Sequence, residues 1–404
     1  MATLTQPKVE RNKLRSANGA RLHSFQIVRP PYEATQEDGL KWLTAAHMQA
    51  ETTRRAAAGE APVDAGFANT ISKLLRRYGC SSEKISKRGH ELEDHLHEDW
   101  QKMQVYSLAE NCKGAAMSAR SQAFARGAQR AIEELFTAEA HAPDDLIHVT
   151  CTGYVSPSAA QLYTVRRGWQ QQTRITHAYH MGCYAALPAI RIASGFLASS
   201  EKQDHRVDIV HNELCTLHLD PSDHSPEQLV VQSLFADGHV RYSLTEEDSG
   251  EDEFSPGFRI LALGEELVPD SAADMRWVVS EWGFRMGLSR DVPAKIGAVL
   301  PQFLARMFAQ AGLAYEEERE SAVFAIHPGG PKIIEQVSDA LGLRVEQSVA
   351  SRKVLFNYGN MSSATLPHVW NEILQNGNAE PGQLVVSLAF GPGLTVCGAL
   401  FQID

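Results

Sequence analysis

The sequence predicts an α/β protein whose two halves share one type of organisation. Strand-like apolar runs alternate with amphipathic helical segments along the chain, which favours helices packed in layers on sheets. Near the middle, the acidic segment TEEDSGEDEFS at 245–255 interrupts this alternation and is the expected boundary between the halves. We predict a loose tail over 1–19, an N-terminal half over 20–250 and a C-terminal half over 251–404.

In the N-terminal half, short apolar runs indicate strands, and apolar residues spaced three to four positions apart indicate helices. The expected strands are 20–28, 145–151, 173–179, 207–214 and 240–242. The expected helices are 35–58, 115–136, 158–169 and 226–235, with a further helix after Cys183. Asp237-Gly238 is interpreted as a turn that leads into the last of these strands.

The C-terminal half follows the same pattern, although no residue-by-residue repeat links it to the first half. The expected strands are 258–263, 322–326, 384–390 and 394–401. The expected helices are 294–312, 332–341 and 365–375. Strands and helices therefore alternate in both halves, as in α/β folds.

Composition excludes several classes of protein. Hydrophobic residues make up 43% and charged residues 22% of the sequence, as in globular proteins, and no run approaches the ~18 apolar residues of a membrane span. A formal net charge of −11 argues against general nucleic-acid binding. The N-terminus lacks the apolar core of a secretory signal, and the six cysteines show no CxxC pair, so we expect a cytoplasmic protein.

One cysteine lies where a predicted strand gives way to a predicted helix. Cys183 is at the centre of THAYHMGCYAALPAIRIASG, and Gly182 permits a tight turn immediately before it. The positive end of a helix dipole and free backbone N–H groups would favour a thiolate there. Taken alone, such a cysteine is more often a buried structural residue, so the interpretation depends on the rest of the chain.

Three polar signatures in the C-terminal half complement this cysteine. His327 follows the apolar strand VFAI and precedes the glycine-rich turn PGGP, a position that points a side chain into a cleft. Asn360 lies in NYGNMSSA, just before a predicted helix. Gly391, Pro392 and Gly393 form a rigid turn between the last two strands. Each signature alone is usually structural.

Two polar clusters in the N-terminal half each have an ordinary interpretation. One is a basic segment that consists of Lys73, Arg76, Arg77, Lys84, Lys87 and Arg88. It fits either a solvated helix face or a binding site for a phosphorylated nucleotide. His90, His95 and His97 lie among acidic residues, but their spacing does not match a metal-binding motif such as HExxH. We interpret these histidines as surface residues and predict no metal site.

Taken together, Cys183, HPGGP, GNMSSA and GPGLT resemble the type III polyketide synthases, the chalcone synthase-like branch of the thiolase superfamily. The resemblance covers about 20–404. HMGCYAALPA and ELCTLHLDPSD are similar to bacterial members that make alkylresorcinols and alkylpyrones. The resemblance implies a thiolase-like, five-layered αβαβα fold of two similar halves and a homodimer.

The chemistry of such an enzyme fits these residues. Cys183 would hold an acyl chain as a thioester, and a nearby His327 imidazolium would stabilise its thiolate, making it the most reactive of the six thiols. Loss of carbon dioxide from malonyl-CoA leaves negative charge on the thioester oxygen, to which His327 and Asn360 can donate hydrogen bonds. The enolate then attacks the Cys183 thioester. CoA thioesters are substrates here, and we expect no metal and no redox cofactor.

The resemblance also implies which residues surround the substrate. Phe235 and Met286 fall at two gate positions between the CoA tunnel and the acyl cavity, where the family usually has phenylalanine at both. A methionine suggests a softer, wider gate. Trp277 falls where plant chalcone synthases carry glycine, which argues against chalcone-type products. Further candidates for the wall or substrate contacts are Cys151, Thr152, Cys215, His218, Ser362, Gly391, Pro392 and Gly393.

Other consequences concern the partner subunit, CoA and alternative functions. Ser156 falls near the position that reaches the partner subunit's cavity in this family, and Lys87 and Arg88 are the candidates for CoA phosphate binding. We expect fatty acyl-CoA starters and alkylpyrone or alkylresorcinol products. The alternative enzyme is a ketoacyl-ACP synthase III-like protein that performs one condensation. A degenerate, non-catalytic binding protein is disfavoured because all three catalytic residue types are present.

Overall fold

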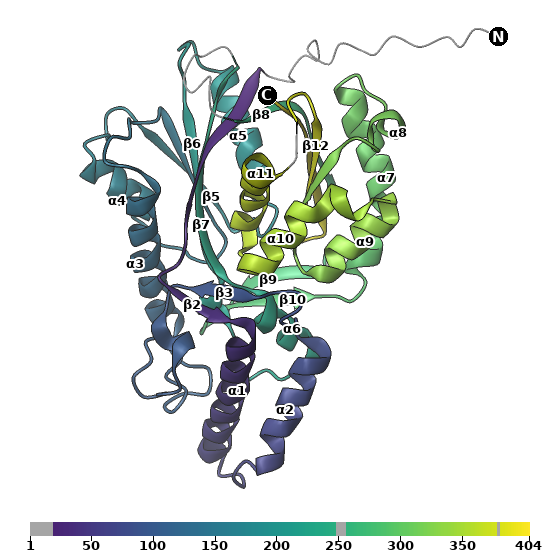
Figure 1. The fold of residues 1–404 in the computed structure, drawn as a ribbon. Helices are drawn as coiled ribbons and strands as arrows, with labels where there is room; N and C mark the ends of the chain where they lie inside the picture. The colour runs from purple at the N-terminus through teal and green to yellow at the C-terminus, as the bar shows by residue number, and fades with distance from the viewer. Residues whose placement is uncertain (1–18, 248–255, 378–379) are drawn as a thin grey trace, which may run out of the picture.

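The computed structural model describes residues 19–247, 256–377 and 380–404. The predicted tail up to residue 18 and most of the predicted boundary segment therefore lie outside the described residues. Within these ranges, a mixed sheet of nine strands runs through the molecule (Figure 1). Its strand order is β11-β12-β13-β8-β1-β7-β6-β4-β5. The strands are β1 (Ala20–Val28), β4 (Asp145–Thr150), β5 (Arg174–Tyr179), β6 (Val207–Leu214), β7 (Asp237–Glu246), β8 (Phe258–Leu267), β11 (Val323–Ile326), β12 (Leu384–Gly391) and β13 (Thr395–Ile403).

The sheet has two parts that meet at a short seam. Strands β1, β4, β5, β6 and β7 come from the first part of the chain, and β8, β11, β12 and β13 come from the second. The parts are joined where β1 pairs antiparallel with β8, at Arg21 with Arg259 and Leu22 with Phe258. Besides this pairing, two helices contact strands of both parts.

Two helices form the central layer. Helix α5 (Ala186–Ala198) contacts β4, β6 and β7 on one side and β13 on the other, and α11 (Thr365–Asn376) contacts both β7 and β11. The apolar face of α11 repeats at helical spacing through Leu366, Val369, Trp370 and Ile373, all of which are buried. The central layer is therefore packed against strands from both parts of the sheet.

Outer helices cover the other faces of the sheet (Figure 1). Helix α3 (Met117–Leu135) packs on β6 and β7 and carries α4 (Ala159–Arg166), whereas α7 (Val292–Gln310) packs on β8 and β13 beside α9 (Pro331–Leu341). The order helix, sheet, helix, sheet, helix confirms the predicted thiolase-like αβαβα fold.

A helical hairpin extends from one end of these layers (Figure 1). It consists of α1 (Gln36–Ala58) and α2 (Ala65–Tyr78), which pack against α6 (Pro226–Leu234). Thr35 caps the start of α1 by accepting a hydrogen bond from the Asp38 N–H, and Gly59 ends it at a φ of 67°. No helix in the described ranges is long and apolar enough to cross a membrane.

The remaining elements are short. They are β2 (Tyr32–Thr35), β3 (Lys87–His90), β9 (Met275–Val279), β10 (Phe284–Leu288), α8 (Tyr315–Glu318), α10 (Val349–Tyr358), η2 (Glu93–Leu96), η3 (Cys215–His218), η4 (Val345–Ser348) and η5 (Ser362–Ala364). Strand β2 pairs with β3, and β9 pairs with β10. Strands β2, β3, β9 and β10 and helix α10 are not among the elements predicted from the sequence.

The turn predicted at Asp237-Gly238 is wrong, because both residues lie in β7. The Asp237 carboxylate accepts hydrogen bonds from the backbone N–H groups of Glu91 and Thr216. A Cβ atom on Gly238 would lie 2.3 Å from the sulfur of Met361, so this position requires glycine for close packing. Tertiary contacts therefore override the local turn signal.

Trp370 offers a test of the central layer. Its indole N–H donates to the Ser387 hydroxyl at 2.8 Å, and its ring packs edge-on against Tyr242 of β7 and Phe401 of β13. We expect Trp370→Ala to lower the free energy of unfolding by about 3–5 kcal/mol, because it opens a cavity between the two parts of the sheet. Urea unfolding measures this. Val345→Ala, at a site 66% exposed, should change stability by less than ~0.5 kcal/mol, and equal effects would contradict this account.

Candidate active site

Cys183 lies in the turn between β5 and α5. The chain leaves β5 at Tyr179 and reaches the cysteine through Gly182, whose φ is 86°. A Cβ atom on Gly182 would lie 2.7 Å from Cδ of Pro392, so both the backbone angle and the space require glycine. The side chain of Cys183 is buried, as the residue is 8% exposed.

His327 and Asn360 approach this cysteine from the C-terminal part of the chain. His327 directly follows β11, and its backbone N–H donates to the Leu388 carbonyl at 2.7 Å. Among the described residues, neither ring nitrogen of His327 has a hydrogen-bond partner. Asn360 follows α10, and its Oδ1 accepts from the Ser362 N–H at 2.9 Å, which turns Nδ2 toward the Gly329 carbonyl at 3.4 Å.

Cys183, His327 and Asn360 line one cavity of about 480 Å³, which we call the histidine cavity. Its other walls are mainly apolar. Phe235 and Met286 were predicted from the sequence. The apolar wall residues that were not predicted are Val231, Leu234, Met275, Leu288, Ile333 and Phe390. Met275 and Leu288 belong to the β9–β10 hairpin, which was itself missed. Apolar and polar residues alternate only weakly in that hairpin, so its sequence did not indicate strands or a cavity wall.

A second cavity, of about 330 Å³, lies on the other side of the same residues. This tryptophan cavity is lined by Cys151, Thr152, Gly182, Cys183, Cys215, Phe235, Met275, Trp277, Met286, Ser362 and Pro392. Among the described residues, Cys183, Phe235, Met275 and Met286 line both cavities. The two residues predicted as gate positions, Phe235 and Met286, are therefore placed between the cavities.

Trp277 is held rigidly in the wall of the tryptophan cavity. Its indole N–H donates to the Cys151 carbonyl at 2.6 Å, and its own carbonyl is 2.9 Å from Nε2 of His180. His180 adopts a positive φ of 61°, an uncommon conformation for this residue type. These contacts fix the indole in the wall of the cavity.

Three predicted substrate-contacting residues lie behind the cavity walls. His218 accepts from the Phe284 N–H through Nδ1, so its Nε2–H donates to the Thr152 carbonyl, and burial lowers its pKa to about 3. Gly391 lies against the Tyr184 ring, and Gly393 donates its N–H to the Met275 carbonyl. These residues support the cavity wall from behind, because their polar groups form hydrogen bonds with other residues of the protein.

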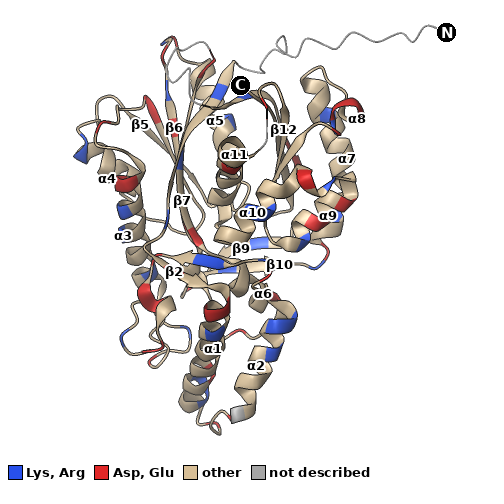
Figure 2. Cartoon of the chain, viewed as in Figure 1, with Lys and Arg blue, Asp and Glu red and all other residues tan. Residues whose placement is uncertain are grey.

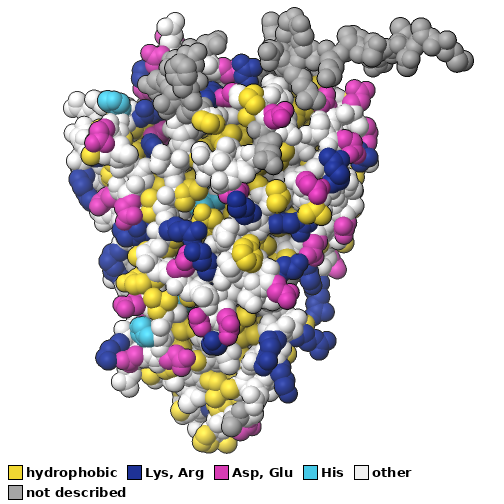
Figure 3. All heavy atoms as spheres, in the orientation of Figure 1, with side chains coloured by type: hydrophobic (Ala, Val, Ile, Leu, Met, Phe, Trp, Pro, Cys, Tyr) yellow, Lys and Arg dark blue, Asp and Glu magenta, His cyan; other side chains and the backbone are white. Residues whose placement is uncertain are grey.

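The predicted CoA-phosphate role of Arg88 is wrong. The residue is only 3% exposed, and its guanidinium donates to Gln36 Oε1 and to the carbonyls of Gln232 and Phe235. Lys87, the next residue along β3, is partly exposed and forms an ion pair with Glu33 at 2.6 Å. Basic side chains gather instead along α2 (Figures 2 and 3).

The surface positions predicted for His90 and His95 are also wrong. Both are buried, and their rings stack with centroids 4.3 Å apart. Within the described ranges, no group of histidine, cysteine, aspartate and glutamate side chains is arranged to hold a metal ion. A sequence rich in charged neighbours cannot reveal that these two rings turn inward.

Burial controls the charge of the candidate catalytic residues. It raises the pKa of the Cys183 thiol to about 12, an effect larger than the opposing hydrogen bonds from Ser362 and Asn360. It also lowers the pKa of His327 to about 3. The structure therefore favours a neutral thiol beside a neutral imidazole, in contrast to the predicted thiolate and imidazolium, because no opposite charge compensates the loss of water.

This charge state predicts how alkylation of Cys183 depends on pH. The thiolate fraction of a group with a raised pKa increases about tenfold per pH unit, so the iodoacetamide rate should keep rising from about pH 6 to about pH 10. Peptide mass mapping over time measures it, with half-exposed Cys112 as a reference for reagent delivery. A rate that levels off near neutral pH would instead show the thiolate and imidazolium pair.

Comparison with known proteins identifies the family. The chain matches the N-terminal domain of the chalcone and stilbene synthases over 67–243 and their C-terminal domain over 260–403. This result favours these enzymes over the ketoacyl-ACP synthase III alternative.

Solved structures share the fold at low identity. The polyketide synthase PKS-I of the brown alga Ectocarpus siliculosus is 20% identical with a TM-score of 0.79, covering 95% of this chain and 98% of that one. The C-terminal type III polyketide synthase domain of Steely1, a type I/III hybrid from Dictyostelium, is 19% identical with a TM-score of 0.76, covering 95% and 99%.

A fungal structure gives the same result. The type III pentaketide synthase of Neurospora crassa is 20% identical with a TM-score of 0.75, covering 96% of this chain and 100% of that one. Since the two family models match in chain order and together cover most of the chain, the chain belongs to the chalcone and stilbene synthase family and is a type III polyketide synthase.

Proposed function

We propose that the enzyme extends an acyl starter held on Cys183 by repeated decarboxylative condensation with malonyl-CoA. The observation that carries this proposal is the histidine cavity, into which Cys183, His327 and Asn360 converge from separate segments of the chain. A nucleophile and two hydrogen-bonding side chains at one buried space are what acyl transfer and enolate formation need. None of the proposed steps calls for a metal or a redox cofactor.

Loading of the starter begins from the neutral pair. The Cys183 thiol attacks the carbonyl carbon of acyl-CoA and passes its proton to His327, whose ring nitrogens are free to accept it. The carbon–sulfur bond to CoA then breaks, and the leaving thiolate takes the proton back from the imidazolium. The acyl group remains on Cys183, next to the tryptophan cavity.

Malonyl-CoA then occupies the histidine cavity. The carbon–carbon bond to its carboxylate breaks, carbon dioxide leaves, and the electron pair forms an enolate with negative charge on the thioester oxygen. The Asn360 Nδ2 donors are oriented by the Ser362 contact on Oδ1, and a His327 N–H supplies another donor. Apolar walls keep water away, so each donor is worth about 3–4 kcal/mol. The enolate carbon attacks the Cys183 thioester, the carbon–sulfur bond to Cys183 breaks, and the lengthened chain is left as a thioester of the CoA that carried the malonyl group. Transfer of this chain back to Cys183 releases CoA and begins the next extension.

We further propose a fatty acyl starter and alkylpyrone or alkylresorcinol products. The tryptophan cavity is lined mainly by apolar and sulfur-bearing side chains, which suit a flexible alkyl chain more than a polar ring. Met286 stands at one gate position, and the fixed indole of Trp277 limits the space for a bulky aromatic starter. These contacts support the proposed substrate class.

CoA binding and assembly are also proposals. The exposed basic side chains of α2, with Lys87, are the candidates for binding the CoA phosphates, since Arg88 is buried.

We propose a homodimer formed along β5, which lies at the edge of the described sheet. Tyr154, Leu162 and Val165 are exposed apolar residues on the neighbouring loop and helix. Ser156 is exposed in the same loop. A reducing cytoplasm is supported by the six free cysteines of the described chain.

Two substitutions separate the proposed steps. Cys183→Ala should abolish chain growth while malonyl-CoA decarboxylation continues, because the oxyanion donors remain. Asn360→Ala should slow both reactions by about 100-fold or more. Release of labelled carbon dioxide and product formation measure the two activities. Asn376→Ala, an exposed asparagine in α11, is the matched control, and equal decarboxylation by wild type and Asn360→Ala would rule out the proposed role of the amide.

The starter is tested by competition among hexanoyl-CoA, dodecanoyl-CoA and coumaroyl-CoA. Each buried methylene contributes up to about 0.8 kcal/mol, so dodecanoyl products should dominate. Met286→Phe should lower the dodecanoyl-to-hexanoyl product ratio by about tenfold, because a stiff ring narrows the gate. Met48→Phe on α1 makes the same change away from both cavities. Preference for coumaroyl-CoA, or no dependence on chain length, would contradict the fatty starter.

A further inference from the structure

The gate residue Phe235 and the candidate oxyanion donor Asn360 are joined by their backbones. The two residues form a parallel β-bridge, in which the Asn360 N–H donates to the Leu234 carbonyl at 3.0 Å and the Ala236 N–H donates to the Asn360 carbonyl at 2.9 Å. Any shift of the chain after α6 therefore moves both the gate and the amide. The position of this bridge depends on what holds the end of α6.

Two side chains from distant segments bind the carbonyl groups at the end of α6. Arg88 Nη1 donates to the Gln232 carbonyl at 2.9 Å and to the Phe235 carbonyl at 2.8 Å. Gln36 Nε2 donates to the Ser233 carbonyl at 2.8 Å and to the Cys80 carbonyl at 2.7 Å. The two side chains also contact each other, since Arg88 Nε donates to Gln36 Oε1 at 2.8 Å. We call this pair the α6 cap.

Arg88 also touches the other side of the bridge. A Cβ atom on Gly359 would lie 3.1 Å from Cγ of Arg88 and 3.0 Å from the Leu234 carbonyl oxygen. Gly359 has a φ of 73°, so the turn that leads to Asn360 needs glycine and packs directly on the arginine stem. One arginine therefore contacts both segments that meet at the bridge.

The charge of Arg88 suits this place. Burying a guanidinium is costly, and burial lowers the pKa of Arg88, although the group remains a cation at neutral pH. The carbonyl groups at a helix C-terminus carry partial negative charge and lack partners within the helix. Three of these carbonyls receive hydrogen bonds from the α6 cap, which compensates the buried charge.

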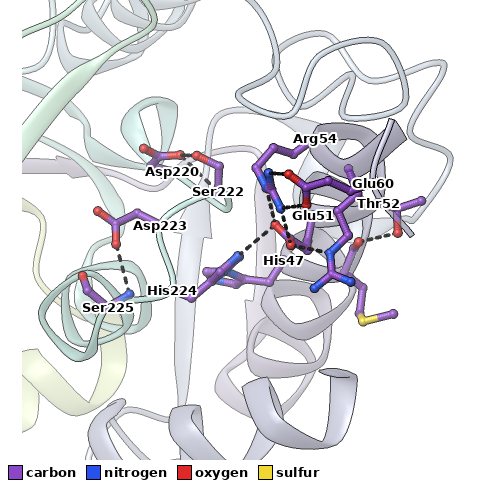
Figure 4. A network of polar contacts seen from close by, with 12 residues as sticks. His47, Glu51, Thr52, Arg54, Glu60, Asp220, Ser222, Asp223, His224 and Ser225 are labelled. Atoms are coloured by element: carbon purple, nitrogen blue, oxygen red, sulfur yellow. Dashed lines mark hydrogen bonds and ion pairs between the residues drawn. The ribbon is translucent and has the colours of Figure 1, made fainter. Parts of the chain in front are cut away.

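The opposite end of α6 is held by the same helix that supplies Gln36. Figure 4 shows His47 and Glu51 of α1 next to His224, in the loop that precedes α6. The Nδ1 atoms of His47 and His224 are 2.7 Å apart, and Glu51 Oε2 lies 3.7 Å from His224 Nε2. Because α1 holds α6 at both ends, the α6 cap determines where the chain leaves the helix.

We propose that Gln36 and Arg88 are positioning residues that set the gate residue Phe235 and the Asn360 amide together. This inference rests on the proposed function, because it assigns the cap an effect on malonyl-CoA decarboxylation and on starter choice. Neither side chain lines a cavity among the described residues, so the effect passes through the bridge.

The test uses the full-length enzyme with Gln36→Met, Arg88→Lys and a matched control. Gln36→Met removes two donors and keeps the buried charge, so it should fold even if Arg88→Lys does not. Arg167→Lys is the control, because Arg167 also donates to backbone carbonyls, those of Thr137, Ala138 and Ala140, far from both cavities. Decarboxylation per folded enzyme should fall by about 10- to 100-fold in the cap variants and stay unchanged in the control.

A double-mutant cycle with Asn360→Ala separates positioning from loss of stability. If the α6 cap acts through the amide, Gln36→Met should slow decarboxylation strongly in the wild-type background and have little further effect once Asn360 is alanine. Equal factors in both backgrounds, or a loss that only follows the folded fraction measured by circular dichroism, would overturn the inference. A wild-type enzyme without decarboxylation would overturn the proposed function itself, whereas active wild type with an additive cycle overturns only the role of the cap.

Discussion

The β-bridge between Phe235 and Asn360 joins the backbones of two residues that are proposed to act in the chemistry. On one side it continues into α6, which lines the histidine cavity, and on the other it leads to η5, where Ser362 orients the Asn360 amide. The bridge is formed by residues far apart in the sequence. Its hydrogen bonds are ordinary in strength, and their proposed importance comes from placing the candidate gate residue and the candidate oxyanion donor in one unit.

The alternation of strands and helices in both halves predicted α/β layers, whereas the five-layered αβαβα order was implied by the resemblance to the type III polyketide synthases. Cys183, His327 and Asn360 each lie in a glycine-containing turn next to a regular element, and the structure brings all three to one cavity, while their catalytic roles stay a prediction. Arg88, His90 and His95 were misplaced because a run of polar residues has the same composition whether a side chain turns inward or outward. Asp237-Gly238 carries a turn signal, yet contacts with Glu91, Thr216 and Met361 keep it in a strand.

The charge of the site shows a different limit of local reasoning. A position just before a helix favours a thiolate by roughly 0.3–1 kcal/mol, and this effect can be read from the sequence around Cys183. Removing an ion from water costs several kcal/mol, and that cost depends on walls supplied by α6, the β9–β10 hairpin and η5. The cost of desolvation is larger than the helix-dipole effect, so the pKa of Cys183 depends on the assembled fold.

The close approach of Gly182 to Pro392 has a consequence for building hybrid enzymes. The turn that carries Cys183 is shaped by the first part of the chain, but the proline ring against it belongs to the last hairpin, between β12 and β13. A chimera that takes one half from a homologue still contains this contact, which leaves almost no room for a larger side chain at Gly182. Chimeras joined between β7 and β8 therefore need the glycine and the proline to be transferred as a matched set.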